Sequence, residues 1–158
     1  MKAKIVFITG ASSGIGEGCA RKFAKEGWNL ILNARTVSKL EELKAELEKE
    51  YGIQVCVLPF DVRDRKQAAA ALEALPEEGR VTNIKPGMVE TNFTVVRYRG
   101  DKQAADNFYK GIRPLTGDDI AETVYYAASA PAHIQIAEVL LMPTYQATGT
   151  ISYKKKAE

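Results

Sequence analysis

The sequence has little of what metal centres, disulfide frameworks and membrane spans require. Its 158 residues include two cysteines, Cys19 and Cys56, and one histidine. The two cysteines stand far apart and match no CxxC pattern, so neither a metal site nor a redox pair is indicated. The apolar run that ends before Gly10 is too short for a transmembrane helix, and no small-residue cleavage site follows it. We therefore expect a cytoplasmic protein without membrane attachment.

A strong excess of one charge sign is also missing. There are 22 basic and 20 acidic residues, which gives a net charge of +2. This balance provides no argument for binding to nucleic acid, a membrane surface or a polyanion. The short basic run from Lys154 to Lys156 is interpreted as part of a solvated tail.

Two periodicities alternate along the chain. Continuous apolar runs of strand length are separated by amphipathic stretches of helical length. A capping box is expected at Ser38-Lys-Leu-Glu41, Gly52 is expected to end that helix, and Asp64 to cap the next one. The predicted strands span residues 4–9, 28–33, 53–58, 81–85 and 134–142. The predicted helices cover residues from Ile15 to Ala24, from Ser38 to Gly52, and 65–75, 101–110 and 118–129.

Apolar strands separated by helices indicate a parallel sheet that is covered on both faces. With right-handed crossovers this gives an α/β protein with a doubly wound, Rossmann-like, three-layer α/β/α sandwich. We expect a single domain over residues 1–145 and a loosely held tail over 146–158.

The turn after the first predicted strand reads Thr9-Gly-Ala-Ser-Ser-Gly-Ile-Gly16. A glycine-rich turn between a strand and a helix can bind phosphate, because the N-terminal amides of the helix face the anion. Gly10 would allow the sharp turn, Gly14 the approach of a pyrophosphate and Gly16 close packing of the helix. The alternative is a glycine-rich turn that binds nothing. The residues assigned to this cofactor-binding loop are Gly10, Ser12, Ser13, Gly14, Ile15 and Gly16.

The TGxxxGxG spacing resembles the cofactor loop of the short-chain dehydrogenase/reductases. The resemblance implies that Asn33-Ala-Arg35 lies beside the adenosine ribose and that the pair Asp61-Val62 lies against the adenine ring. Arg35 stands where a carboxylate would favour a free 2′-hydroxyl, and a guanidinium there can pair with a 2′-phosphate. NADP is therefore expected rather than NAD. The alternatives are a solvated surface arginine at 35 and a turn-capping aspartate at 61.

The resemblance continues in the second half of the chain. Pro86-Gly87-Met-Val-Glu-Thr91 is similar to the family's loop after its sixth strand, which implies that Pro86, Gly87 and Thr91 contact the nicotinamide carboxamide. The wording VTNIKPGMVET, followed by VVRYRGDK and LMPT, resembles the NADP-dependent subgroup that oxidises serine and related 3-hydroxy acids.

The family's catalytic residues have no counterpart here. Its Asn-Asn-Ala-Gly segment is missing, since no two asparagines are adjacent, and so is its catalytic serine. Its Tyr-x-x-x-Lys spacing occurs once, at Tyr98 and Lys102, but after the Pro-Gly loop and with Gly100 inside it. We interpret this match as accidental and the surrounding basic residues as a solvated or substrate-facing loop. His133 is expected to be structural. No catalytic residue is therefore assigned.

Between Glu78 and Gly79 the chain skips two strands and two helices of the family fold. The later strands would then close a five-stranded sheet of order 3-2-1-4-5. We interpret this clean join as an engineered minimal version of a dehydrogenase, with a natural remnant as the alternative. Because the skipped helices include those with which the family usually dimerises, any homodimer would differ from the family's.

Three functions follow from this interpretation. The first is an NADP(H)-binding domain that turns nothing over. The second is an active oxidoreductase on small hydroxy acids, with Tyr98 and Lys102 on a flap. The third is a scaffold that binds no ligand.

Overall fold

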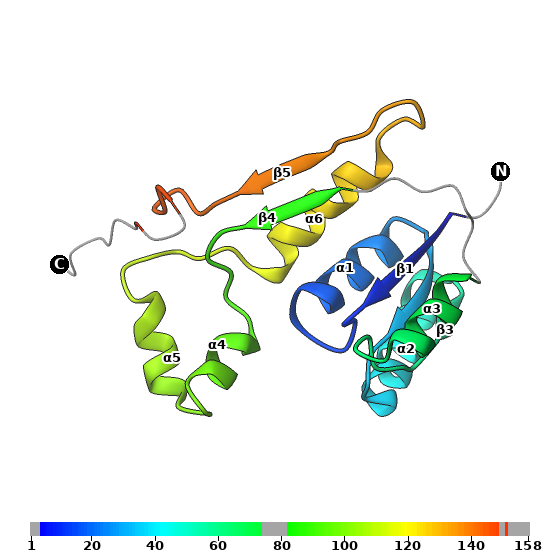
Figure 1. The fold of residues 1–158 in the computed structure, drawn as a ribbon, viewed down its shortest axis with the longest axis horizontal. Coiled ribbons are helices and arrows are strands. Elements are labelled where there is room, and N and C mark those ends of the chain that lie inside the picture. The colour runs from blue at the N-terminus through cyan, green and yellow to red at the C-terminus, as the bar shows by residue number, and fades with distance from the viewer. Residues whose placement is uncertain (1–3, 74–81, 149–150, 152–158) are drawn as a thin grey trace. The chain divides into compact units, whose positions relative to one another are not determined.

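A computed structural model describes residues 4–73, 82–148 and 151 of the chain. Strands and helices alternate from β1 to β4, and three helices, α4, α5 and α6, then precede β5 (Figure 1). The chain divides into two compact units, Met1–Arg80 and Val81–Glu158, and each is described by itself.

Unit 1 contains a parallel sheet with β2 in the middle. Each residue from Ile5 to Thr9 of β1 pairs with the corresponding residue from Asn29 to Asn33 of β2, and Leu30 to Leu32 pair with Val55 to Val57 of β3. Parallel pairing requires crossover connections, and α1 and α2 provide them. The elements are β1 (Ile5–Thr9), α1 (Gly14–Lys25), β2 (Asn29–Asn33), α2 (Val37–Tyr51), β3 (Val55–Val57) and α3 (Arg65–Glu73).

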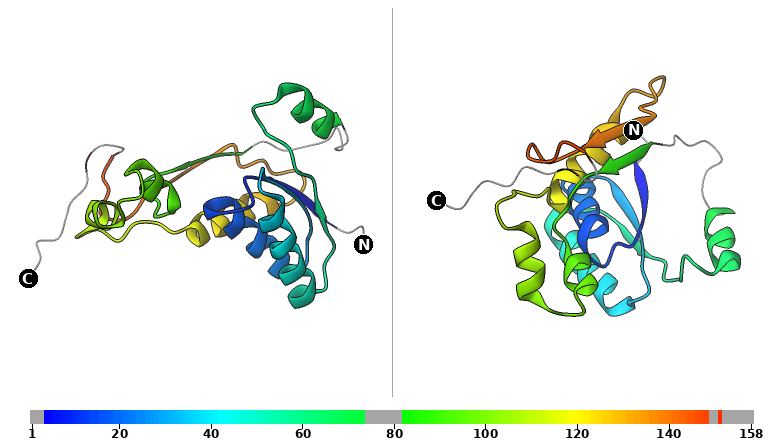
Figure 2. Two further views of the ribbon diagram at one scale, coloured as in Figure 1. Left: turned by 90° about the horizontal axis from the view of Figure 1, so that it is seen from below. Right: turned by 60° about the vertical axis from the view of Figure 1, so that its left-hand side comes forward.

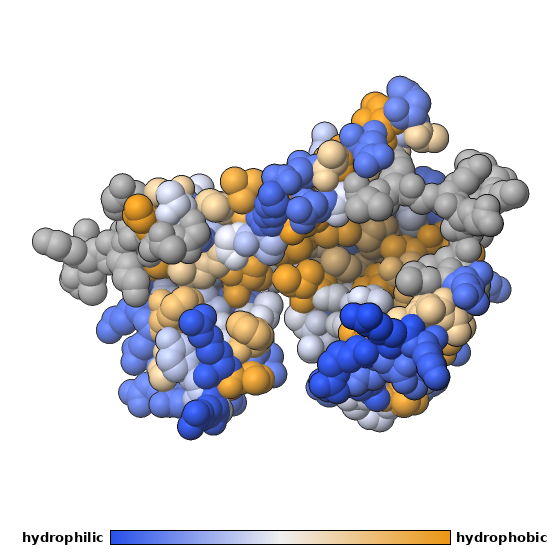
Figure 3. Space-filling view, viewed as in Figure 1, coloured by the Kyte–Doolittle hydropathy of each residue, from blue (hydrophilic) through white to orange (hydrophobic). Residues whose placement is uncertain are grey.

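The core of unit 1 forms where α1 and α2 pack against each other and against the strands (Figure 2). The largest fully buried apolar side chains come from these elements: Phe23, Leu30, Leu32, Leu40 and Leu47. The Phe23 ring also meets the ring of Trp28 edge to face, with centroids 5.0 Å apart. Hydrophilic residues gather over α2 and α3 (Figure 3). The burial of the apolar side chains named above holds the ends of β1, β2 and β3 in a fixed arrangement.

Two of the predicted helix ends of unit 1 are confirmed and one is wrong. Gly52 ends α2 in the left-handed conformation, with φ 65°, and the Asp64 carboxylate accepts from the backbone amides of Lys66 and Gln67. The predicted capping box at Ser38 is wrong, because Thr36 already occupies the N-cap and Ser38 lies inside the helix. The third strand is also shorter than expected.

Unit 2 contains a second parallel pair, in which Asn83 to Pro86 of β4 face Glu138 to Leu141 of β5. Asp101 caps α5, and Thr116 and Asp119 form a reciprocal capping box at α6. Helix α4 was not predicted, although Thr91 caps it by accepting from the amide of Phe93. The elements are β4 (Asn83–Pro86), α4 (Asn92–Arg97), α5 (Lys102–Tyr109), α6 (Gly117–Ser129) and β5 (Glu138–Leu141).

The parallel α/β architecture is confirmed within each unit, whereas the complete sheet order stays a prediction. The described strands form one sheet of order β1-β2-β3 and another of β4-β5, and no described residue of β1 pairs with β4. The single domain and the five-stranded order 3-2-1-4-5 therefore remain expectations. The predicted join between Glu78 and Gly79 lies outside the described residues.

The contact between α1 and the preceding loop predicts the effect of a methyl group at Gly16. A Cβ there would lie 2.3 Å from the carbonyl oxygen of Gly10, which is backbone and cannot rotate away. We expect Gly16→Ala to lower the free energy of unfolding by about 1–3 kcal/mol, measured by urea denaturation. Glu17→Ala, on the same turn, should change it by no more than about 0.5 kcal/mol. A Gly16→Ala midpoint equal to that of the parent chain would contradict the close approach.

Candidate nucleotide-binding site

The loop after β1 has the geometry of a phosphate-binding turn. Gly10 adopts φ 68°, a conformation that favours glycine, and nothing lies within 4 Å of the position of its missing Cβ. Helix α1 begins at Gly14, and Gly16 brings its first turn against the loop backbone. Ser13 is the N-cap, but its side chain makes no capping hydrogen bond. The Ser13 hydroxyl and the first amides of α1 are therefore available to an anion.

A cavity of about 390 Å³ lies beside this loop, a volume typical of small-molecule sites. Three segments line it: the loop after β1, the end of β2 and the segment after β3. Because parallel strands end at the same edge of the sheet, these segments meet there. The lining residues are Gly10, Ser12, Ser13, Asn33, Ala34, Arg35, Thr36, Phe60, Asp61, Val62 and Arg63.

The cavity brings together seven residues that the sequence assigned to the cofactor. They are Gly10, Ser12, Ser13, Asn33, Arg35, Asp61 and Val62. Gly14, Ile15 and Gly16 lie next to it in the first turn of α1 but not in its lining. Val62 is 56% exposed, so part of its side chain is accessible from the cavity that it lines.

Asn33 ties the cavity walls together. Its side chain is buried, with 1% exposed, and its Nδ2 donates to the carbonyl oxygens of Leu58 at 3.0 Å and Phe60 at 3.1 Å. Its backbone carbonyl accepts from the amide of Ala11. The Oδ1 atom is buried and makes no hydrogen bond to any residue that the structure describes. An unpaired buried acceptor is costly, and here it lies on a residue that lines the cavity.

Two arginines and one carboxylate also line the cavity. The Arg63 guanidinium donates from Nε and Nη2 to both carboxylate oxygens of Asp61, with the shortest distance 2.6 Å. Hydrogen bonds from the Arg63 side chain and backbone, with a smaller effect of the Arg35 charge, lower the pKa of Asp61 to about 2. Arg35 is exposed and makes no hydrogen bond to the residues described here. Sequence reasoning missed Arg63, although the spacing Asp-x-Arg already indicated that the two side chains could meet.

The three remaining assigned residues, Pro86, Gly87 and Thr91, lie in unit 2. The neighbouring amide of Met88 donates to Oε1 of Gln146 at 2.7 Å, and the same oxygen would lie 2.5 Å from a Cβ on Gly87. Gln146 thus holds the Pro-Gly loop, although it is the first residue of the segment that was expected to be a loose tail. These contacts of the Pro-Gly loop are thus made with other residues of unit 2.

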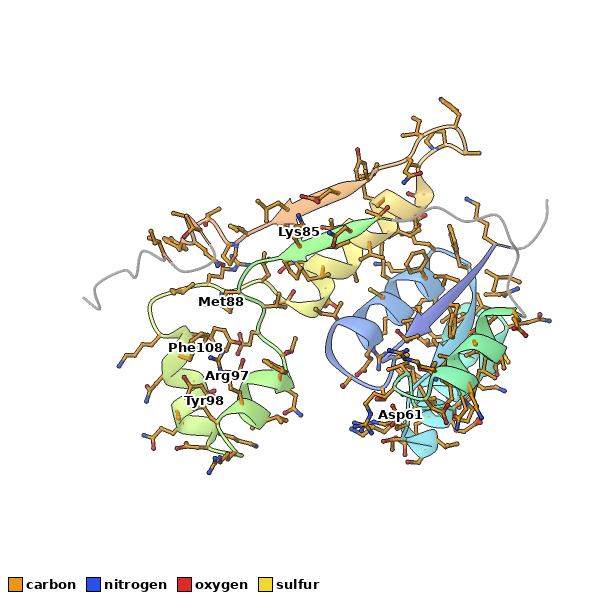
Figure 4. All side chains as sticks on the ribbon, viewed as in Figure 1. Asp61, Lys85, Met88, Arg97, Tyr98 and Phe108 are labelled. Carbon is orange, nitrogen blue, oxygen red and sulfur yellow. The ribbon has the colours of Figure 1, made fainter. Side chains whose placement is uncertain are left out.

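Tyr98 and Lys102 do not share a helix. Tyr98 is the C-cap of α4 and Lys102 is the first residue of α5, with positive φ angles at Arg99 and Gly100 between them. The Tyr98 ring instead lies 6.3 Å from that of Phe108, between the two helices (Figure 4). Their sequence spacing therefore does not give the one-turn geometry that a tyrosine–lysine pair needs. His133 is exposed.

The described residues also limit other kinds of site. Within residues 4–73 and 82–148, no group of three or more histidine, cysteine, aspartate or glutamate side chains could hold a metal ion. Among the helices in these ranges, none has both the length and the apolar character needed to cross a bilayer.

The role of Asn33 predicts a large cost for its removal. Asn33→Ala leaves the carbonyl oxygens of Leu58 and Phe60 without this donor, so we expect the free energy of unfolding to fall by about 2–3 kcal/mol. Urea denaturation measures this change. The control is Asn29→Ala, which removes an exposed acceptor for the backbone amide of Gln54. Because water can replace this acceptor, the free energy of unfolding should fall by at most about 1 kcal/mol. Equal losses in the two variants would contradict a special role for Asn33.

Comparison with known proteins identifies the family. The family model for short chain dehydrogenase matches residues 4–79. Serine 3-dehydrogenase of Agrobacterium fabrum is 30% identical over 239 aligned positions, which cover 89% of this chain and 94% of that protein. An NADP-dependent 3-hydroxy acid dehydrogenase of Salmonella typhi is 42% identical over 247 positions, with 94% and 98% covered. Both alignments are longer than this 158-residue chain, so each relative has residues without a counterpart here.

The fold agrees with that assignment. The structure described as the closed form of serine dehydrogenase complexed with NADP+ matches with a TM-score of 0.77 and 21% identity, covering 96% of this chain and all of that one. This likeness shows a Rossmann-like fold. The family itself is shown by the sequence relatives: the chain belongs to the short-chain dehydrogenases.

Proposed function

We propose that this chain binds NADP(H) through the cavity of unit 1 and does not carry out catalytic turnover. The observation that carries the proposal is the position of Arg35 in one cavity with a glycine loop that opens helix α1. A helix N-terminus and a guanidinium in the same cavity provide two separate sites for phosphate groups.

The residues of the cavity suit such a nucleotide. Gly10 leaves its loop free of side-chain obstruction, and Asn33 provides a buried acceptor without a partner among the described residues. The names of several relatives also support the cofactor: an NADP-dependent 3-hydroxy acid dehydrogenase of Schizosaccharomyces pombe is 27% identical over 256 positions, covering 99% of each chain. The Salmonella typhi relative is likewise named for NADP dependence.

Each wall of the cavity has a distinct task in this proposal. The first amides of α1 and the hydroxyls of Ser12 and Ser13 bind the pyrophosphate, and Arg35 pairs with the 2′-phosphate. Val62 packs against the adenine ring. In an intact dehydrogenase the nicotinamide supplies hydride-transfer chemistry, which also needs protein groups that hold and move a proton.

Those proton-handling groups are what this chain lacks. Tyr98 and Lys102, its one match to the family's spacing, lie on separate helices. Losing a general acid alone lowers a rate by about 10²–10⁴-fold. The opposing hypothesis, an active oxidoreductase on small hydroxy acids, draws support from the retained Pro-Gly loop and from the names of the relatives. A scaffold without ligand binding is the third possibility, and a titration separates it from the first.

Arg35→Ala tests the cofactor assignment. Removing a charge-assisted hydrogen bond worth about 1.5–3 kcal/mol should weaken NADPH binding by about tenfold to a hundredfold. NADH has no 2′-phosphate, so its affinity should change by no more than about twofold. Fluorescence titration of both nucleotides measures this, with Lys39→Ala as a charge-matched control outside the cavity lining. Failure of the parent chain to bind NADPH or 2′-phospho-ADP-ribose would favour the scaffold.

Turnover assays test the inactive assignment. We expect no NADPH formation above background when the chain is mixed with NADP+ and serine or 3-hydroxypropionate, because no tyrosine–lysine pair is formed. If turnover is observed, Tyr98→Phe decides its origin. Substantial activity that this substitution abolishes would establish the rebuilt oxidoreductase instead.

A further inference from the structure

We infer that Arg63 is a specificity-determining residue of the cavity, because it neutralises Asp61 and so leaves Arg35 free to bind a phosphorylated ribose. This inference rests on the proposed nucleotide-binding function. Arg63 contacts no ligand in this account and acts only through its carboxylate partner.

The first step is the pairing itself. The Asp61 carboxylate has two arginines within its electrostatic reach, Arg63 and Arg35, and all three residues line the cavity. Arg63 holds it at both oxygens, and the backbone amide of Arg63 donates to Oδ1 as well, at 3.0 Å. Arg63 thus gives the Asp61 carboxylate two side-chain donors and one backbone donor. Such a fork fixes the relative geometry of the two side chains.

The second step is the charge that remains. Asp61 stays ionised at neutral pH, since the pKa of its carboxyl is lowered to about 2. With Arg63 in place the pair is neutral, and the unbalanced charge among the three groups is the guanidinium of Arg35. Without Arg63 the carboxylate would repel a phosphate and would compete with that phosphate for Arg35. A nucleotide with a 2′-phosphate should therefore lose more affinity than one without it.

The third step separates this role from folding. The Arg63 side chain is 76% exposed, and the side-chain hydrogen bonds that it makes to described residues go to Asp61. Exposed ion pairs contribute little to stability, so replacing Arg63 should leave the fold intact. An effect of the substitution on nucleotide preference would then reflect the electrostatics of the cavity.

The experiment uses the full chain with Arg63→Gln, Asp61→Asn and the double substitution. NADPH and NADH are titrated by fluorescence at low ionic strength, where exposed charges act most strongly. We expect Arg63→Gln to weaken NADPH binding by about three- to tenfold and NADH binding by less than about twofold. In the Asp61→Asn background, the same Arg63→Gln substitution should change NADPH affinity by less than about twofold. Arg65→Gln, an exposed arginine at the start of α3 and outside the cavity lining, is the matched control and should change neither affinity.

Each other outcome overturns the inference in a recognisable way. If Arg63→Gln weakens NADPH binding equally in the parent chain and in the Asp61→Asn background, Arg63 binds the phosphate directly. If Arg65→Gln has the same effect, only the overall charge matters. If Arg63→Gln has no effect although the parent chain binds NADPH, the neutralising role is refuted while the proposed function stands. A parent chain that binds neither nucleotide refutes the proposed function itself. As a control for folding, the urea midpoint of each variant is measured, and an unchanged midpoint excludes unfolding as the cause of a loss of affinity.

Discussion

The candidate site depends on Asn33, because this one residue connects the three segments that form the cavity. Its carbonyl oxygen accepts from Ala11 in the loop after β1, and its side chain donates to Leu58 and Phe60 after β3. Hydrophobic burial of α1 and α2 brings the strand ends together, but burial is non-directional and cannot set loop positions to within a hydrogen bond. Asn33 supplies that directional restraint at the edge of the sheet where parallel strands end.

This restraint also fixes the positions of the charged residues that line the cavity. Arg35 follows Asn33 by two residues, and Asp61 follows Phe60 directly, so the hydrogen bonds of Asn33 fix both walls on which these charges stand. Exposed arginines and carboxylates would otherwise pair in many arrangements of similar free energy. A fixed separation allows one carboxylate to be satisfied by Arg63 while Arg35 faces the cavity without a hydrogen-bonding partner among the described residues.

Sequence patterns predicted the parts of this structure that depend on local chemistry. The glycine loop, the first three strands and the caps at Gly52 and Asp64 were predicted because turn geometry and apolar runs act over a few residues. The capping box at Ser38 failed because α2 already begins at Val37, so that Ser38 lies inside the helix. Helix α4 was missed because six residues carry too little periodicity. The contact of Gln146 with the Pro-Gly loop joins residues 58 positions apart, and no local signal encodes such a contact.

The residues that form the cavity lie close together in the sequence. All cavity-lining residues fall between positions 10 and 63, inside one unit and within the segment that the family model matches. Their positions depend on a sheet of three strands and on hydrogen bonds made within it. The relatives are longer: the alignment with serine 3-dehydrogenase spans 239 positions, so that protein has residues without a counterpart in this 158-residue chain. Because the walls of the cavity make their contacts with one another, the shape of this cavity is set within unit 1.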